Sequence, residues 1–300
     1  MTSLTVSRRR FIQTAGAASV LVPTSVKGYS GVEMAPTESQ EAPQIGMSKW
    51  ELDTPSLCVD LDALEANLAT MERTVSRNGI ASRPHAKTHK CPAIARLQLE
   101  AGAVGICTAK ISEAVAMFAH GIKQLLKTTP NVTPFKIQLA MSLRASCAGF
   151  IQATDTHENA RLLSEAAQEA GVVADVVVDG DSGGHRTGIT PGQPALALAQ
   201  LIDQLPGLRL RGLLCYDGGS QHVKGFEARR TRTLERLSPA TETKLLMDRS
   251  GLNTEIFSGG GTGTYNIDHE TAGLTDVQVG SYVFMDAQYL GIGGASNLSL

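Results

Sequence analysis

The distribution of apolar and polar residues from about residue 50 onward predicts alternating strands and helices. Short apolar runs separated by longer amphipathic segments predict strands at Ser56–Asp60, Ser82–Lys87, Val104–Thr108, Gln124–Thr128, Ala148–Ala153, Ala174–Asp179, Leu210–Tyr216, Glu255–Ser258 and Val277–Phe284. About eight such alternations favour a closed (β/α)8 barrel of the TIM type, an α/β fold, over an open doubly wound sheet.

Helical periodicity is clearest in three of the segments between these runs. The apolar residues of Leu64–Val75 form one stripe, and Gly79 follows as a C-terminal cap. His157–Ala170 repeats this pattern, and Pro191–Leu205 begins with proline at a position that helices tolerate. Each segment has one apolar face that can cover a sheet.

Composition narrows the class of protein. The chain has 300 residues, of which 42% are hydrophobic and 19% charged, so it can bury a large core and is not a disordered chain. Its five cysteines are scattered and exclude a disulfide scaffold. A net charge of −2 does not indicate a nucleic-acid partner. No apolar run reaches the roughly 20 residues of a membrane helix.

The first 48 residues differ from the rest. Ser7 to Ile12 reads Ser-Arg-Arg-Arg-Phe-Ile, and the weakly apolar stretch Thr14–Val22 follows. Residues 1–30 therefore resemble a twin-arginine export signal, with a disordered basic tail as the alternative. Residues 31–48 are a polar linker. We expect export to the periplasm by the twin-arginine route.

A lysine stands at the end of the second predicted strand. Strand alternation would place Arg83, His85 and Lys87 on one face. Barrels carry their chemistry at these strand ends, and a partly desolvated lysine beside positive charge has a lowered pKa. Lys87 is therefore a candidate for Schiff-base chemistry, with a solvated surface lysine as the alternative.

Two later strand ends carry further candidates. Arg186 lies in the polar loop after Ala174–Asp179, where it could hold an anionic oxygen or pair with a loop aspartate. Tyr216 ends the next strand and His222 follows six residues later, which makes them a possible acid–base pair. A structural or solvated histidine is the alternative reading of His222.

A glycine-rich segment, Ser258–Tyr265, directly follows a predicted strand. Its four glycines and three hydroxyl residues predict a phosphate-binding loop, although it is not a P-loop. A reactive lysine and a phosphate site together indicate pyridoxal phosphate. A phosphosugar aldolase with a Schiff-base lysine fits these bare features nearly as well.

Several motifs resemble one known family. Asp53-Thr54-Pro55, Arg83 to Lys90, Gly105 to Lys110 with Glu113-Ala114, and Ser258 to Tyr265 are similar to the D-threonine aldolase and D-serine dehydratase family, within the alanine-racemase-like pyridoxal phosphate barrels. The resemblance extends over about residues 50–294. It implies a pyridoxal phosphate-binding barrel at residues 49–286.

The resemblance implies a role for each candidate residue. Lys87 would carry the cofactor with His85 beside it, Arg186 would contact its phenolic oxygen, and Tyr216 would line the substrate side of its ring. His222 matches the proposed base of the aldolases, and Gln278 would face the pyridine nitrogen. The phosphate would be held by Gly260, Gly261, Thr262, Gly280 and Ser281.

The implied reaction is cleavage of D-3-hydroxy amino acids, such as D-threonine, to glycine and an aldehyde, with Lys87, His222 and Tyr216 as catalytic residues. The alternatives are elimination of ammonia, as in a D-serine dehydratase, and cofactor binding without lyase activity. The small-molecule substrate would be a D-amino acid, and the assembly a homodimer.

Members of this family continue into a β-rich C-terminal domain with a divalent metal site. From the resemblance, we expect residues 287–300 to be the start of that domain, truncated here, and the metal ligands to lie beyond residue 300.

Overall fold

The computed structural model describes residues 46–293, 298 and 299. The predicted export signal and most of the predicted linker lie outside these residues. The chain divides into two units at Val59 and Asp60. In the first unit Ser48 caps the short 3-10 helix η1 (Lys49–Glu51), and its side chain accepts the Trp50 N–H.

The strand predicted at Ser56–Asp60 is wrong. These residues form no strand, and Leu57 is fully exposed. An extended segment becomes a strand only when a neighbour supplies hydrogen bonds, and this segment pairs with none of the described strands.

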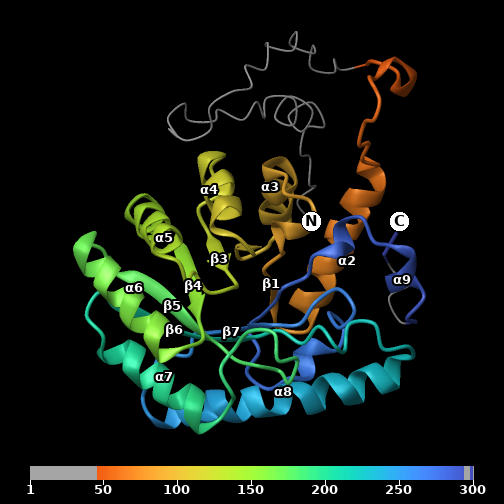
Figure 1. Cartoon of the computed structure of the whole chain (residues 1–300). Helices are drawn as coiled ribbons and strands as arrows, with labels where there is room; N and C mark the ends of the chain where they lie inside the picture. The colour runs from red at the N-terminus through yellow and green to blue at the C-terminus, as the bar shows by residue number, and fades with distance from the viewer. Residues whose placement is uncertain (1–45, 294–297, 300) are drawn as a thin grey trace, which may run out of the picture. The chain divides into compact units, whose positions relative to one another are not determined.

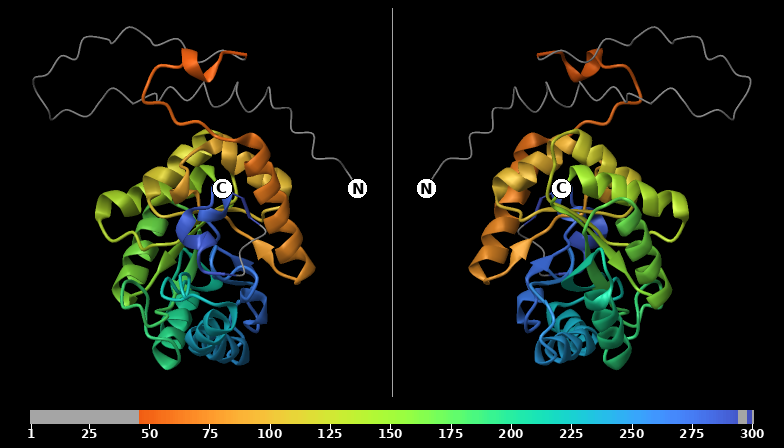
Figure 2. Two further views of the ribbon diagram at one scale, coloured as in Figure 1. Left: turned by 90° about the vertical axis from the view of Figure 1, so that its right-hand side faces the viewer. Right: turned by 90° about the vertical axis from the view of Figure 1, so that its left-hand side faces the viewer.

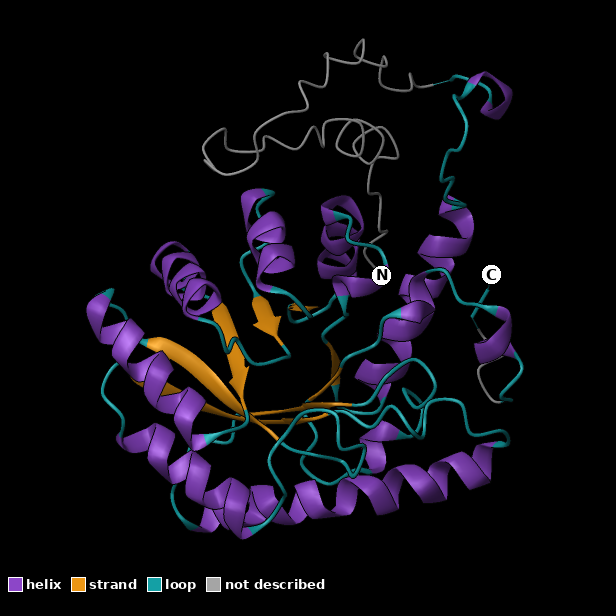
Figure 3. Cartoon of the chain, viewed as in Figure 1, coloured by secondary structure: helices purple, strands orange, loops and turns teal. Residues whose placement is uncertain are grey.

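The second unit alternates strands and helices (Figures 1 and 3). The strands are β1 (Ala81–Ser82), β2 (Ile106–Thr108), β3 (Leu125–Lys127), β4 (Phe150–Thr154), β5 (Ala174–Asp179), β6 (Leu208–Cys215), β7 (Ile256–Gly259) and β8 (Asp276–Val277). The α-helices are α2 (Leu61–Arg77), α3 (Pro92–Ala101), α4 (Ile111–Ala119), α5 (Pro134–Ser146), α6 (His157–Glu169), α7 (Gln193–Gln204), α8 (Phe226–Arg249) and α9 (Ala287–Leu290). Three 3-10 turns are η2 (Ala86–Thr88), η3 (Asp268–Glu270) and η4 (Ser281–Val283).

The strands form one parallel sheet in the order β1-β8-β7-β6-β5-β4-β3-β2. Its two ends are joined, because the Val104 N–H donates to the Ser82 carbonyl at 2.9 Å and the Cys107 N–H to the Pro84 carbonyl at 2.7 Å. The helices form the outer layer around the strands (Figure 2). The predicted (β/α)8 barrel is therefore confirmed.

Burial explains why these segments form a barrel. Its interior is filled by the buried side chains of Cys107, Leu126, Ile151, Ala153, Val177, Leu214 and Ile256. Strands β4 and β5 are buried along their whole length, as expected for parallel strands covered on both faces. On α2, the predicted stripe between Leu64 and Val75 is buried against the sheet side of the helix.

Two predicted strands are much shorter than expected. Of Ser82–Lys87 only Ser82 lies in a strand, and of Val277–Phe284 only Val277 does. Just beyond each strand the chain turns into a 3-10 helix, η2 or η4. Consequently, the prediction that strand alternation places Arg83 and Lys87 on one face is wrong. His85 and Lys87 are nevertheless in contact, because the Lys87 backbone N–H donates to His85 Nδ1.

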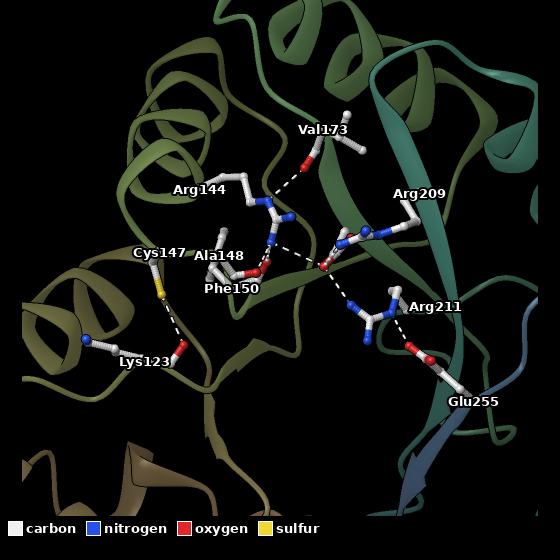
Figure 4. A network of polar contacts seen from close by, with 10 residues as sticks. Lys123, Arg144, Cys147, Ala148, Phe150, Val173, Arg209, Arg211 and Glu255 are labelled. Atoms are coloured by element: carbon white, nitrogen blue, oxygen red, sulfur yellow. Dashed lines mark hydrogen bonds and ion pairs between the residues drawn. The ribbon is translucent and has the colours of Figure 1, made fainter.

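A charged network lies near the amino ends of β5 and β6, whereas these turns follow the carboxyl ends of β1 and β8. Figure 4 shows the network from close by. Asp175, at the start of β5, has a fully buried side chain that pairs with Arg144 at 3.2 Å, Arg209 at 2.5 Å and Arg211 at 2.6 Å. Arg211 also pairs with Glu255. A buried carboxylate is tolerated here because three guanidinium groups surround it.

Among the residues that the structure describes, no helix is both long and apolar enough to cross a membrane.

Candidate active site

A cavity of about 300 Å³ opens at the carboxyl ends of the strands. In a barrel, the loops at this end carry the functional side chains. Five of the predicted site residues line it, namely His85, Lys87, Arg186, Tyr216 and Gln278. They follow four different strands, so the tertiary structure has brought together residues that are nearly 200 positions apart.

Lys87 lies in η2, and its ammonium nitrogen is 5.4 Å from the centre of the Tyr216 ring. The guanidinium carbon of Arg186 is 5.6 Å from the same centre. Burial, and then the positive charge of Arg186, lower the pKa of the Lys87 amine. The uncharged, nucleophilic form of this amine is therefore more populated at a given pH than that of an ordinary lysine.

His85 is buried beneath this amine. Its Nδ1 accepts the Lys87 backbone N–H at 3.3 Å, and its Nε2 is 3.2 Å from the Thr128 hydroxyl. Burial, followed by the charges of Lys87 and other neighbours, lowers the pKa of His85 well below its usual range. The ring is consequently neutral, and it caps the turn that carries Lys87.

Arg186 is presented by a closed loop. The Asp181 N–H donates to the Ile189 carbonyl and the Ile189 N–H to the Asp179 carbonyl, both at 2.9 Å, which joins the two ends of the loop. A side chain at Gly188 would lie 2.5 Å from the Asp181 nitrogen, so only glycine fits there. Asp181 pairs with His185 at 2.8 Å, and no ion pair between the described residues joins a loop aspartate to Arg186.

Hydrogen bonds and an ion pair among side chains outside the cavity lining fix the position of Gln278. Its Nε2 donates to the Ser258 hydroxyl at 3.0 Å, and that hydroxyl donates to Asp276 at 2.6 Å. Asp276 in turn pairs with Arg83 at 3.0 Å. Arg83, predicted on the same face as Lys87, thus supports Gln278 rather than lining the cavity.

The five predicted phosphate-binding residues come from two loops that the fold brings together. The Thr262 hydroxyl accepts the backbone N–H groups of Gly280 at 3.3 Å and of Tyr282 at 3.1 Å. A side chain at Gly280 would lie 2.7 Å from the Thr88 hydroxyl, so this loop packs directly on η2. Gly260, at φ +61°, turns the chain back after β7.

The glycine loops nevertheless stand beside the cavity, because none of their five predicted residues is among those that line it. The Gly261 N–H donates within its own loop, to Thr264 at 3.1 Å and Asp268 at 3.3 Å.

His222 is also outside the cavity lining. It is exposed, and its ring packs on that of Tyr289 in α9, with 4.5 Å between ring centres and a 40° tilt. The structure therefore places His222 on the same loop as Tyr216 but at the surface.

Two acidic residues at this end were not predicted. Asp179, at the carboxyl end of β5, lines the cavity, and burial raises its pKa to about 7. Asp268, fully buried beneath the Gly261 amide, has its pKa raised to about 8 by burial. The strand-end rule that singled out Lys87 could have found Asp179, whereas nothing in the sequence distinguishes Asp268. The described residues contain no cluster of three or more metal-ligating side chains.

Comparison with known proteins places the chain in a family. The model of the alanine racemase N-terminal domain matches residues 59–288. The chain is 40% identical to D-threonine aldolase of Arthrobacter sp. over 79% of its own length and 62% of the relative's. It is 35% identical to 3-hydroxy-D-aspartate aldolase of Paracoccus denitrificans strain Pd 1222, over 81% of the chain and 63% of the relative.

A solved structure of a related enzyme has the same fold. The crystal structure of D-threonine aldolase from Filomicrobium marinum superposes with a TM-score of 0.79 at 39% identity, covering 83% of this chain and 67% of that one. The chain spans less than two thirds of the length of the two curated relatives. From the matched domain and the shared barrel, this chain belongs to the alanine racemase N-terminal domain family.

Proposed function

We propose that the barrel binds pyridoxal phosphate and that the protein is a lyase of D-3-hydroxy amino acids. One observation carries the proposal: the amine of Lys87 and the guanidinium of Arg186, which come from different segments of the chain, line one cavity, and both lie over the ring of Tyr216. The relatives, a D-threonine aldolase and a 3-hydroxy-D-aspartate aldolase, support the substrate class.

The residues present fit the cofactor. Lys87 offers an amine of lowered pKa for an aldehyde, and Arg186 offers a cation for a phenolic oxygen. Beside them, the two glycine loops meet at Thr262, and Gly280 packs so closely on Thr88 that a side chain would not fit. Backbone amides and hydroxyls concentrated in this way are the usual donors to a phosphate.

The chain's own residues have separable tasks. When bound, pyridoxal phosphate supplies an electron sink for negative charge at Cα of an amino acid. Lys87 would hold the cofactor, Arg186 would bind its phenolic oxygen, and Gln278 would face its ring nitrogen. Burial raises the pKa of Tyr216, so its hydroxyl is a hydrogen-bond donor at neutral pH. In the aldolase reaction, His222 would remove the proton of the substrate 3-hydroxyl.

A dehydratase is the second candidate, and one observation favours it. Lys87 lines the cavity whereas His222 does not. In that reaction Lys87 would remove the α-proton and hydroxide would leave from Cβ, so no base at His222 is required. The end products separate the two candidates, because only the aldolase releases glycine and an aldehyde, and only the dehydratase releases ammonia.

The test uses the purified chain with added pyridoxal phosphate. Absorption spectra are recorded with and without D-threonine, and borohydride reduction followed by peptide mapping locates the attached cofactor. We expect attachment at Lys87, a spectral shift with D-threonine, and formation of glycine. Lys87→Ala should abolish attachment, whereas the neighbouring Lys90→Ala should retain it.

Other outcomes discriminate among the alternatives. Attachment at Lys87 with no conversion of D-threonine, D-serine or D-3-hydroxyaspartate would indicate a cofactor-binding protein without lyase activity. Absence of attachment in the wild-type chain would remove the proposal and leave a phosphosugar aldolase, which borohydride would trap with its own substrate instead.

We also propose export by the twin-arginine route and assembly as a homodimer. The first rests on the arginines at positions 8–10 and on the Phe11-Ile12 that follows them. Fusing residues 1–45 to a folded reporter tests it, and replacing all three arginines by lysine should block transport. The second rests on the family resemblance, and sedimentation of the purified chain tests it.

A further inference from the structure

A buried hydrogen bond joins two distant segments next to the cavity. The Gln98 side-chain nitrogen, in α3, donates to the Tyr282 hydroxyl, in η4, at 3.1 Å. Gln98 is 1% exposed and Tyr282 is not exposed at all. Buried polar side chains are almost always hydrogen-bonded, and a satisfied buried pair makes the segments that carry it more rigid.

On one side, this bond leads to the glycine loops. The Tyr282 N–H donates to the Thr262 hydroxyl at 3.1 Å, and the same oxygen accepts the Gly280 N–H. Tyr282 is therefore fastened by its backbone to both loops and by its hydroxyl to α3. Moving Tyr282 would move the loops that are proposed to hold a phosphate.

On the other side, the bond leads to the turn that carries Lys87. His89 is the C-terminal cap of η2, and its Nδ1 accepts the Cys91 N–H at 3.0 Å. Burial lowers the pKa of His89 to about 4, while the neighbouring Gln98 side chain opposes this shift. A neutral ring that accepts at Nδ1 carries its proton on Nε2.

The remaining polar atoms of this pair match each other. His89 Nε2, a donor, and Gln98 Oε1, an acceptor, are both buried and both lack a hydrogen-bond partner among the described residues. A buried donor or acceptor without a partner destabilises the folded state. A small movement that brings His89 Nε2 and Gln98 Oε1 together would give each a partner, so this movement is favoured. With that hydrogen bond formed, a chain of contacts would run from η2 through α3 to η4.

We propose that His89, Gln98 and Tyr282 form a buried relay that fixes the Lys87 turn relative to the two glycine loops, with Gln98 as a positioning residue. The link between the two segments does not depend on a bound cofactor. Its consequence for binding does rest on the proposed function: the link keeps the Lys87 amine and the phosphate site at the separation that the cofactor requires.

The first test needs no cofactor. Amide hydrogen exchange of the wild-type chain is compared with that of Gln98→Leu, which keeps the volume, removes the hydrogen bond to Tyr282 and leaves His89 no acceptor at this position. We expect exchange about tenfold faster in residues 86–90 and in residues 280–283 together, as expected for the loss of about one buried hydrogen bond.

The matched control is Gln152→Leu. Gln152, in β4, is equally buried and accepts a hydrogen bond from Asn131 at 3.0 Å, a residue that belongs to neither segment. It should lower global stability without speeding exchange in residues 86–90. Equal exchange patterns in the two variants, or faster exchange in only one of the two segments, would overturn the relay.

The second test measures the dissociation constant for pyridoxal phosphate. Gln98→Leu and Tyr282→Phe should each weaken binding about tenfold, and the double variant also about tenfold, because both remove the same link. A hundredfold loss in the double variant, or no loss in either single variant, would contradict the positioning role. If the wild-type chain itself does not bind, the proposed function fails, while the exchange experiment still decides the relay.

Discussion

The backbone N–H of Lys87 donates to Nδ1 of His85 at 3.3 Å, and this contact decides where the histidine proton lies. Nδ1 must accept, so the neutral ring carries its proton on Nε2, toward the Thr128 hydroxyl at 3.2 Å. The histidine beside the amine is thus uncharged. The lowered pKa of Lys87 comes from burial and from Arg186, not from a histidine cation.

The charge state of His85 gives the first prediction. Because its folded pKa is far below that of the unfolded chain, His85 should not titrate between about pH 6 and 8, and its contribution to stability should fall as pH drops below about 6.5. Nitrogen NMR of labelled protein should show a protonated Nε2 and a bare Nδ1. A ring that titrates near pH 6.5 would contradict this assignment.

His222 gives the second prediction. His222→Ala should reduce cleavage of D-threonine by about 10²-fold or more, as for loss of a general base, and leave the affinity for pyridoxal phosphate unchanged. His120→Ala, a change at another exposed histidine, is the control. Steady-state rates and cofactor titrations measure both. An unchanged rate would remove His222 from the reaction and favour Lys87 as the only base.

Asp179 gives the third prediction. Its folded pKa of about 7 lies above the unfolded value of about 3.9, so the folded state holds this proton more tightly. Its contribution to stability is therefore lost as pH rises from about 4 to about 7. Asp179→Asn should be more stable than wild type at pH 8, by at most about 4 kcal/mol, and show no gain at pH 4.

Urea unfolding at the two pH values measures this effect. Asp203→Asn, on the exposed face of α7, should show no such dependence. If Asp179→Asn gives the same stability difference at pH 4 and pH 8, Asp179 is already ionised in the folded protein at pH 4.

Asp175 gives the fourth prediction. Asp175→Ala would leave three arginines at the far end of the barrel without their shared carboxylate (Figure 4). We expect a loss of about 3 kcal/mol in the free energy of unfolding, with unchanged affinity for pyridoxal phosphate. Arg209→Ala should cost less, because its side chain is 53% exposed. Equal losses would show that solvent does not screen Arg209.

The fold brings together four residues proposed from the sequence, although two of the strands expected to carry them are shorter than predicted. Lys87, Arg186, Tyr216 and Gln278 do line one cavity. The alternation that led to Lys87, however, requires a strand that stops at Ser82, and the lysine reaches the cavity from a 3-10 turn instead. Strand length depends on hydrogen bonds from neighbours, which a local pattern does not contain.

The periodicity of apolar residues predicted the barrel, and the polar residues near strand ends singled out Lys87, although the strand assumed to carry it ends at Ser82. Periodic apolar residues indicate which face of a segment can be buried, and glycine-rich turns follow from backbone sterics at each position. Only the tertiary structure decided that His85 is neutral, that Asp179 binds its proton tightly, and that His222 lies on Tyr289 outside the cavity. The two protonation states depend on desolvation and on charges from distant segments, and the His222 contact depends on the position of α9, all of which exist only after the chain has folded.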